Sequence, residues 1–332
     1  MGFPLSRHRS AAGNPYGFSN LGVVKGAGLT VRAIATIGNY DYMFDYVFHM
    51  DASLEVAVRA SGYLQSSFYY PDQSKWGPRI QEATQGSLHD HILTYKADFD
   101  ILGTDNSFEI SELKAKTVTQ PWFPELGEFE QIELEKSYLQ TEAPLNYAPN
   151  GQAMYCVVNR NETNKWGTER GYRIVPGRSN VHLSTLKSPF SRWQSEMSKN
   201  HLSITRYHDT EPFANSVQNI NLPWAPQQNF SKFFDGESVD NEDLVVFFNL
   251  GMHHFTRSED IPVTLYTEAY SSIVFAPQNF FDRAQDGDIL NRRWVVGNAN
   301  GTLTYKDYGV PMPTCAVNLT EPVFAIDKIA TL

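Results

Sequence analysis

Histidine residues stand in this sequence at a spacing that suits a metal ion. His89 and His91 are two residues apart in a segment, 88–102, whose pattern predicts a long strand. Side chains at i and i+2 of a strand leave the same face roughly 6.5–7 Å apart, so both imidazoles can bind one ion while Asp90 points the other way. A third nitrogen ligand is needed, and His253–His254 at the end of another predicted strand offers it. Three imidazoles suit copper or zinc, whereas non-haem iron usually takes a carboxylate as well.

The second unusual stretch is Thr36-Ile37-Gly38-Asn39-Tyr40-Asp41, where a Gly-Asn pair interrupts a run well suited to strands. Residues 29–36 alternate like a half-buried strand, and the aromatic-rich residues 42–49 are predicted to be buried on both faces. The simplest interpretation is a kink between two core strands. Asn39 would then place a short amide beside the phenol of Tyr40.

The elements that must position these residues are predicted to be strands. Alternating or apolar runs bounded by turn residues mark further short strands, and residues 71–86 read as a polar loop. The chain has 17 Tyr, 21 Phe, 18 Pro and 22 Gly, a composition that favours strands and turns over helix bundles. We expect an all-β fold, a large antiparallel β-sandwich with few short helices, of which 189–199 is the best candidate. The other predicted strands are 53–60, 67–70, 166–175, 203–207 and 243–251, with a hairpin over 108–138.

Composition excludes several classes of protein. The formal net charge of the 332 residues is -10, with both signs interspersed, so no basic face for nucleic acid or an anionic membrane is expected. No apolar run has the length of a transmembrane helix. Cys156 and Cys315 are the only cysteines, too few for a disulfide framework or a cysteine zinc site, and whether they pair is open.

Taken together, these motifs resemble those of the copper amine oxidases, the topaquinone-containing primary-amine oxidases, over almost the whole chain. The family motif T-x-x-N-Y-[DE] matches residues 36–41 at every defined position, and an H-x-H follows about fifty residues later. A third motif, G-x-x-H-x-x-R-x-E-D-x-P, matches residues 251–262 and aligns the third copper ligand with His254, with His253 as its neighbour. The tail 275–283 is also similar to the family, and the flanking sequence is most similar to its fungal branch. The resemblance implies the family's catalytic "supersandwich" domain over residues 23–332 without its first strands, after a poorly specified lead-in over 1–22.

The resemblance also implies roles for individual residues. Tyr40 would be the precursor of topaquinone, formed by the protein itself with bound copper(II) and O₂, and Asn39 would position the ring. Copper would be held by His89, His91 and His254. The quinone carbonyl would take a primary amine as a Schiff base, and oxidation would release aldehyde, ammonia and H₂O₂.

A second metal site and a partner follow from the same resemblance. Oxygen ligands suit calcium or manganese rather than copper, although the acidic residues of this set could also simply face solvent. The excursion over 104–138 resembles an arm that embraces a second subunit, so a homodimer is expected. The residues of the implied structural cation site are Asp98, the Phe99 backbone, Asp100, Asp243 and the Leu244 backbone.

The chain departs from the family pattern in one chemical respect. The family's catalytic base is an aspartate well before the quinone tyrosine, but residues 1–39 contain no Asp or Glu. Three hypotheses therefore stand: a primary-amine oxidase, a copper-binding and quinone-forming fragment impaired in turnover, and a three-histidine zinc hydrolase. Loss of a general base costs on the order of 10²–10⁴-fold in rate. The sequence does not name the amine. Four N-glycosylation patterns favour an extracellular location for the full-length protein, and a cytoplasmic one stays open.

Overall fold

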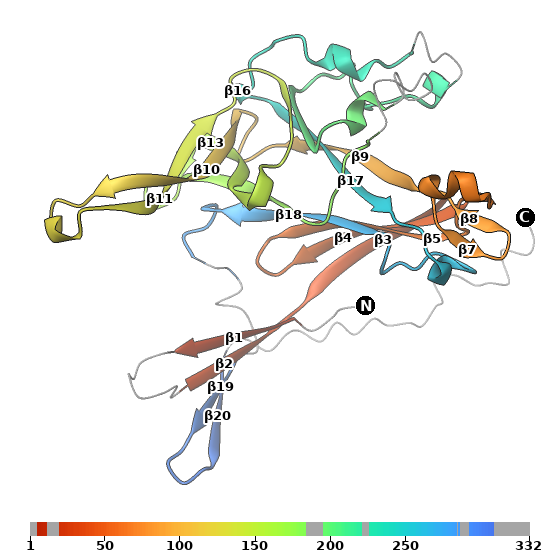
Figure 1. Ribbon diagram of the computed structural model, residues 1–332. Helices are drawn as coiled ribbons and strands as arrows, with labels where there is room; N and C mark the ends of the chain where they lie inside the picture. Colours follow the sequence, from red (N-terminus) through yellow and green to blue (C-terminus); the bar gives the residue numbers. More distant parts are fainter. Residues whose placement is uncertain are drawn as a thin grey trace, which may run out of the picture. The chain divides into compact units, whose positions relative to one another are not determined.

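The computed structural model describes residues 5–11, 20–183, 195–220, 226–283, 285 and 292–308. The chain divides into two compact units, one formed chiefly by residues 28–284 and the other by residues 3–27 and 285–332. Antiparallel sheets dominate, and the helices in the described ranges are short 3-10 segments (Figure 1). The predicted all-β class is therefore confirmed. No helix in these ranges is long and apolar enough to cross a membrane.

The larger sheet of the first unit has the strand order β11-β10-β13-β14-β18-β5-β4-β3, with the short strand β16 also paired to β10. Residues 42–49 were predicted to be buried on both faces, but one face of β4 carries Asp41 and Asp45, and Phe48 on the other face is 47% exposed. In β5, Val56, Ala57 and Val58 are buried. The members are β3 (Gly28–Ile37), β4 (Tyr40–His49), β5 (Leu54–Gly62), β10 (Asn106–Thr119), β11 (Glu128–Tyr138), β13 (Ala153–Thr163), β14 (Glu169–Pro176), β16 (Asp240–Glu242) and β18 (Tyr270–Gln278).

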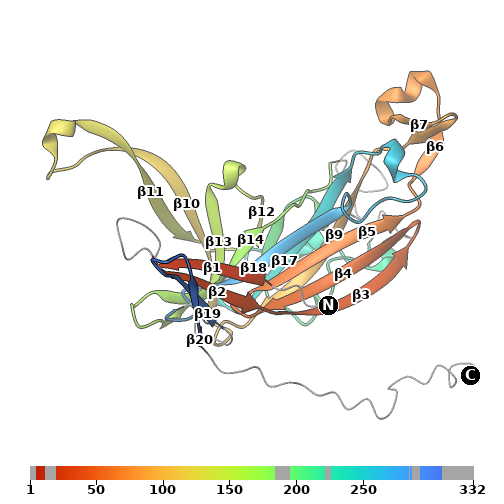
Figure 2. The same cartoon turned by 90° about the horizontal axis from the view of Figure 1, so that it is seen from below.

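A second sheet, with the order β12-β15-β17-β9, packs against the first. A small three-stranded sheet, β6-β8-β7, lies at one end of the unit, opposite the β10–β11 hairpin (Figures 1 and 2). The strands are β6 (Ser66–Phe68), β7 (Arg79–Gln81), β8 (Thr84–Gly86), β9 (His89–Phe99), β12 (Ala143–Leu145), β15 (Leu202–Arg206) and β17 (Leu244–His254). The 3-10 turns are η1 (Pro71–Trp76), η2 (Pro124–Leu126), η3 (Pro149–Gly151), η4 (Glu196–Ser198), η5 (Val217–Ile220), η6 (Phe230–Phe233) and η7 (Ser258–Asp260).

Strand β17 is buried on both faces, as its almost unbroken apolar sequence requires. Its inner face meets the larger sheet, where the Phe248 ring lies 5.3 Å from the Phe275 ring of β18. Its outer face carries Phe247, which packs against Phe230 and Phe233 of η6. Burial on both sides fixes this strand firmly in the core. A functional residue at the end of β17 is therefore held in a fixed position.

The Gly-Asn interruption is a hairpin turn. Ile37 of β3 pairs with Tyr40 of β4, which leaves Gly38 and Asn39 as a two-residue loop. Gly38 has φ of +61°, the positive value that such tight loops need at their first position. A side chain at Gly62 would place its Cβ 2.3 Å from the carbonyl oxygen of Asn39, so only glycine allows β5 to pass this turn. The turn makes Tyr40 the first residue of a buried strand.

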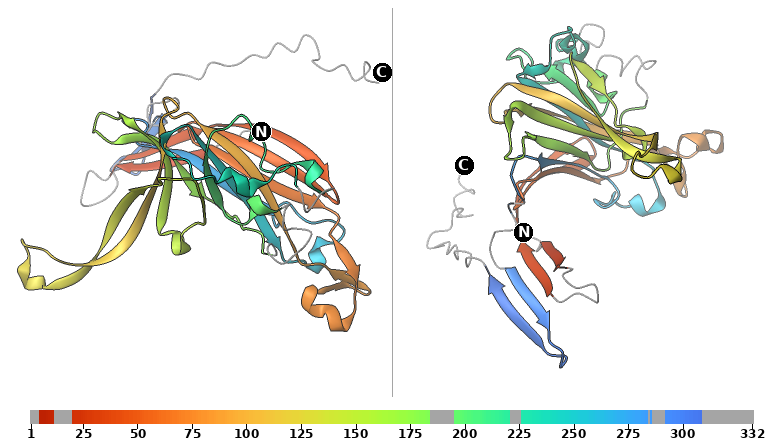
Figure 3. Two further views of the ribbon diagram at one scale, coloured as in Figure 1. Left: turned by 90° about the horizontal axis from the view of Figure 1, so that it is seen from above. Right: turned by 90° about the vertical axis from the view of Figure 1, so that its left-hand side faces the viewer.

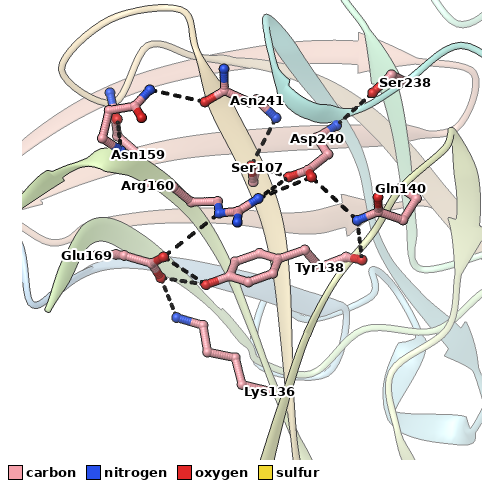
Figure 4. Close-up of polar contacts among 11 residues, drawn as sticks. Ser107, Lys136, Tyr138, Gln140, Asn159, Arg160, Glu169, Ser238, Asp240 and Asn241 are labelled. Atoms are coloured by element: carbon pink, nitrogen blue, oxygen red, sulfur yellow. Dashed lines mark hydrogen bonds and ion pairs between the residues drawn. The ribbon is translucent and has the colours of Figure 1, made fainter.

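The predicted hairpin over 108–138 is confirmed as β10 and β11, which extend beyond the sandwich (Figures 2 and 3). A network of polar side chains holds its base (Figure 4). Tyr138 donates to the Glu169 carboxylate at 2.7 Å, and the Arg160 guanidinium lies 4.4 Å from the Tyr138 ring centroid. Arg160 also donates to Asp240 at 2.8 Å. These contacts join β11 to β13, β14 and β16 and fix the direction in which the hairpin leaves the body.

Three local predictions differ from the structure. The polar loop predicted over 71–86 contains η1, β7 and β8. The helix predicted over 189–199 lies partly outside the described residues, and its described end forms only the 3-10 turn η4. Residues 1–22 were assigned to a poorly specified lead-in, but 5–11 and 20–22 belong to strands.

Those strands form the second unit. Its sheet has the order β1-β2-β19-β20, with β1 (Leu5–Ala11), β2 (Asn20–Gly26), β19 (Arg292–Gly297) and β20 (Leu303–Tyr308). β2 pairs on one side with the neighbouring β1 and on the other with β19 from the far end of the chain, and no local pattern could reveal this second pairing. The proposed domain boundary at residue 23 stays a prediction.

Candidate metal centre and quinone site

Three histidines converge between the two sheets of the first unit. Strands β9 and β17 are paired so that His254 lies opposite His89, and His91 lies opposite Met252. One nitrogen from each of His89, His91 and His254 falls within 4.8 Å of the other two. Their neighbour His253 has its side chain on the opposite face of β17, where it is 26% exposed. The structure therefore decides between the two histidines that the sequence offered as the third ligand.

Each histidine has one ring nitrogen occupied by protein and the other facing the centre. The Nδ1 atom of His89 lies 2.7 Å from the carbonyl oxygen of Ser87, to which it donates. Its Nε2 atom lies 3.0 Å from Nε2 of His91 and 3.1 Å from the hydroxyl of Tyr40. The bond to a carbonyl fixes the tautomer, because only a protonated Nδ1 can donate, and this leaves the lone pair of Nε2 free for a metal.

The other two histidines are oriented by side chains. The Tyr42 hydroxyl lies 2.7 Å from Nδ1 of His91, so Nε2 of His91 faces the centre. Asp260 holds Nε2 of His254 at 3.1 Å and also accepts the backbone N–H of Arg257 at 2.9 Å. The Nδ1 atom of His254 is buried and has no hydrogen-bond partner among the described residues. A buried nitrogen left without a partner, aimed at two others, is what a bound metal ion would satisfy.

Burial keeps the imidazoles in the form that binds metals. Burial, and after it the neighbouring His89 and His254, lower the pKa of His91 to about 4. Burial also lowers the pKa of His254, against the opposing effect of Asp260. Metal ligation needs neutral imidazole. At neutral pH these two rings therefore bind without first losing a proton.

Tyr40 lies at the centre of this cluster. Its side chain is 5% exposed, and its ring centroid is 4.7 Å from that of His91. Its hydroxyl also accepts the backbone N–H of Gln65 at 3.4 Å. Burial raises its pKa above the ordinary value. The first residue of β4 thus places a buried phenol within hydrogen-bond distance of a candidate metal ligand.

Comparison with known proteins agrees with this arrangement. The family model described as "Copper amine oxidase, enzyme domain" matches residues 1–296. Copper amine oxidase vicK1 of Bipolaris victoriae (strain FI3) is 39% identical over 285 residues, which are 84% of this chain and 39% of that protein. The chain belongs to the copper amine oxidase family. It spans about two fifths of the length of the curated relatives it matches, for example 36% of the copper-containing amine oxidase 3 of Rattus norvegicus, to which it is 34% identical over 85% of its own length.

Solved structures confirm the fold of this copper amine oxidase domain. The crystal structure of the Aspergillus nidulans amine oxidase matches with a TM-score of 0.86 and 36% identity, covering 99% of this chain and 43% of that one. The Pichia pastoris lysyl oxidase matches with a TM-score of 0.83 and 33% identity, covering 97% of this chain and 44% of that one. The predicted antiparallel sandwich is therefore the fold of the family.

A second group of potential metal ligands joins β9 to β17. Carboxylate oxygens of Asp98, Asp100 and Asp243 lie within 4.8 Å of one another. Burial and then the neighbouring carboxylates raise the pKa of Asp98 and Asp243. One oxygen of Asp243 is buried and has no hydrogen-bond partner in the part of the chain that the structure describes. These observations fit a cation in an oxygen site, as the resemblance implied for these three residues.

A third acidic group, Glu142, Asp235 and Glu237, escaped the sequence analysis. The buried carboxylate of Glu142 accepts the backbone N–H groups of Arg206 at 3.1 Å and of Asp235 at 2.9 Å. Glu237 pairs with His208 at 2.6 Å. Glu142 therefore already has protein donors and needs no cation to satisfy it.

The sequence analysis also missed the residues that orient the ligands. Tyr42 could have been found, because it stands two residues after Tyr40 on a strand and so shares its face. Asp260 belongs to the third motif, but no role could be assigned to it from the sequence. Thr36 and Asp41, the outer positions of the quinone motif, hydrogen-bond to each other across the hairpin at 2.5 Å. These two positions of the motif thus stabilise the hairpin turn that precedes Tyr40.

Proposed function

We propose that this chain is the catalytic part of a primary-amine oxidase that uses copper and a topaquinone derived from Tyr40. The observation that carries the proposal is the geometry at one point between the sheets. There the buried hydroxyl of Tyr40 lies 3.1 Å from Nε2 of His89, beside the unpartnered Nδ1 of His254. A copper site and an oxidisable phenol at that distance are what formation of a protein-derived quinone needs.

The residues of this chain supply the ligands and their orientation. Nε2 of His89, Nε2 of His91 and Nδ1 of His254 would hold the copper, and their other nitrogens are occupied by Ser87, Tyr42 and Asp260. Asn39 is the second residue of the turn that immediately precedes Tyr40. Burial excludes water from most of the site and keeps the histidines neutral. Copper and the quinone, when present, would supply oxidation of a primary amine to aldehyde and ammonia, with O₂ reduced to H₂O₂.

The test is carbonyl staining after copper loading in air. Phenylhydrazine should give a coloured adduct with the wild-type chain, and Tyr40→Phe should give none. Tyr270→Phe is the matched control, because it removes a phenol that lies away from the three histidines and leaves the precursor. No adduct with the copper-loaded wild type would overturn the quinone assignment. It would leave copper or zinc binding at the three histidines to be measured separately.

A second outcome, a quinone without amine turnover, rests on the distribution of carboxylates. Residues 1–39 contain neither Asp nor Glu. Besides burial, the charge of Asp260 raises the pKa of Tyr40. Its carboxylate, however, already bonds to His254 and to the Arg257 backbone N–H. A proton-abstracting base would then come from polypeptide outside this sequence. Adduct formation without peroxide release from a primary amine would favour this impaired fragment over the complete oxidase.

The exposed inner face of β3 supports the same view. Leu29, Val31 and Ile37 are on the face that β3 shares with the core side of β4, yet they are 66%, 53% and 59% exposed. In an apolar strand of a sandwich such residues are normally covered. We therefore propose that the active oxidase contains further polypeptide that covers this face, as the greater length of the relatives allows.

Two further parts of the proposal are supported by geometry. A calcium or manganese ion would relieve the mutual repulsion of Asp98, Asp100 and Asp243 and satisfy the buried oxygen of Asp243. A homodimer would cover the apolar face of the β10–β11 hairpin. The amine itself stays open, because the relatives include proteins named for diamines and for lysyl groups.

A further inference from the structure

We infer that Asp90, on the face of β9 opposite the copper ligands, is a positioning residue for the copper site and acts through His182. This inference rests on the proposed copper binding at His89, His91 and His254. It concerns residues that make no contact with the metal. It assigns to the pair Asp90–His182 the task of holding the start of β9 in place.

The start of β9 needs such support. β9 is the last strand of its sheet, so only its β17 side is paired within the described structure. Its first and third residues are His89 and His91, two of the three ligands. The ends of edge strands are where backbone pairing opens most easily. A metal site tolerates errors of only about 0.2 Å in its ligand distances. A frayed strand end would therefore lose two ligands together.

Asp90 provides contacts on the outer face of β9. Its carboxylate accepts from Nδ1 of His182 at 2.8 Å and from the backbone N–H of Leu183 at 3.3 Å. Nδ1 of His253, its register partner on β17, lies 3.9 Å away. The cross-strand pair Asp90–His253 thus stands directly beside the pair His89–His254, on the opposite face. A shift or rotation of the strand that moved the ligands would have to break these contacts.

His182 is itself fixed to the core strand. Its backbone N–H donates to the carbonyl of Ser198 at 2.9 Å, and Asn180 donates to Gly251 of β17 at 3.1 Å. Asn249 of β17 donates to the carbonyls of Met197 and Asn200, both at 2.6 Å. The residues that receive Asp90 are therefore tied to β17 directly through Asn180 and indirectly through Ser198, whose neighbours Met197 and Asn200 are held by Asn249. Asp90 and His182 give the edge strand a second, side-chain connection to the strand that carries His254.

The strand pattern indicated for Asp90 only that its side chain points away from the metal. The structure joins it to His182 across a long stretch of chain. A mere surface ion pair would contribute little, about 0–1 kcal/mol. Here the side chains of His182 and Asp90 are only 20% and 15% exposed, and the hydrogen bond restrains the backbone between two ligands.

The experiment compares copper affinity, measured by competition with a chelator, for Asp90→Ala, His182→Ala and His182→Asn. Each alanine variant should lower the affinity by about 10–100-fold, the usual effect of removing an outer-shell support. His182→Asn keeps a donor near the position of Nδ1 and should bind closer to wild type. The copper EPR spectrum of the alanine variants should broaden or shift, since the ligand geometry becomes heterogeneous.

Thr94→Val is the matched control. Thr94 is on the same outer face of β9 and donates to Asn249 of β17 at 2.5 Å, but it lies beyond the ligand pair. Its loss should leave copper affinity and EPR unchanged. Equal losses from Thr94→Val and Asp90→Ala would show general destabilisation of β9 and overturn the assignment. Unchanged affinity in both alanine variants would also overturn it.

A second readout uses the metal-free chain and separates this inference from the proposed function. Amide hydrogen exchange at residues 89–92 should speed up in Asp90→Ala and His182→Ala and stay at the wild-type rate in Thr94→Val. If the wild type fails to bind copper, the proposed function is wrong, while this exchange pattern still supports the role of Asp90 and His182 in holding the start of β9. If amide exchange at residues 89–92 is the same in all variants, the role of Asp90 and His182 in holding the start of β9 is refuted, even when copper binds.

Discussion

At the scale of single residues, the site is defined by which nitrogen of each histidine remains free. Ser87, Tyr42 and Asp260 each occupy one ring nitrogen, so the remaining three face one point. The three supports differ in chemistry: a backbone carbonyl, a phenol and a carboxylate. Of the three, Tyr42 can be removed with the least change in shape. It therefore offers a clean measurement of what such a support contributes.

Tyr42→Phe should weaken copper binding on the order of tenfold, because Nδ1 of His91 loses the partner that fixes its ring. Burial raises the pKa of Tyr42 to about 12, so the hydroxyl is neutral at working pH and no charge is removed. Chelator competition measures the effect. Tyr270→Phe, which removes a phenol hydrogen-bonded to Glu55 at 3.0 Å away from the histidines, is the control. Equal affinity in the two variants would show that Tyr42 gives His91 no support.

At the scale of elements, the β10–β11 hairpin is an amphipathic ribbon. Leu113 pairs with Leu134 and Ala115 with Ile132 on one face. On the other face Lys116 lies 2.6 Å from Glu133, and Lys114 pairs with Glu135. The three large apolar side chains Leu113, Ile132 and Leu134 are 45%, 72% and 57% exposed. A two-stranded ribbon this exposed gains stability when its apolar face is covered, and a second copy of the chain is the proposed cover.

Leu134→Asp should therefore weaken a homodimer by more than tenfold, since burying one leucine contributes about 1.5–3 kcal/mol and a dimer contains two. The stability of the monomer should change by only about 0.5 kcal/mol, because the residue is exposed. Sedimentation velocity over a concentration series measures the association. Glu133→Gln alters the charged face of the same ribbon and should leave the dimer intact. A wild type that stays monomeric at high concentration would contradict the prediction.

At the scale of the whole molecule, the sandwich buries β17 and leaves β3 exposed. The core strand β17 is covered on both faces, whereas the apolar inner face of β3 is largely exposed. An exposed apolar edge strand promotes association with other chains. The same face runs toward Tyr40, because β3 pairs with β4 up to the hairpin. Polypeptide that covered it would also approach the quinone site.

Replacing Leu29 and Val31 together with serine should reduce binding of an apolar fluorescent dye and reduce aggregation. It should change the free energy of unfolding by no more than about 0.5 kcal/mol per site, because these side chains are exposed. Urea unfolding and dye fluorescence measure the two effects. Ile34→Ser, on the other face of β3 and 60% exposed, is the control and should leave most of the dye binding. A loss of several kcal/mol would show that the inner face is already packed.

Much of the candidate site could be predicted from the sequence because its parts are local. The two-residue period of a strand places His89 and His91 on one face, and the motif around Tyr40 occupies six consecutive residues. The strand character of the region was also evident, because alternation and burial leave a mark within eight or ten residues. The Gly38–Asn39 turn shows the limit: the sequence marked the interruption, while the register of Ile37 with Tyr40 showed it to be a hairpin.

Only the tertiary structure decided which groups meet from distant parts of the chain. It showed why His254, which the family motif had singled out, and not His253 meets His89 and His91: the register of β17 with β9 sends alternate side chains to opposite faces. It joined Asp90 to His182 and paired β2 with β19. It also brought Tyr42 to His91 and Asp260 to His254. Such contacts depend on how sheets and strands pair over long separations, and no short-range pattern records that. The sequence by itself determined the ligands and the all-β class; long-range pairing determined the geometry in which the ligands act.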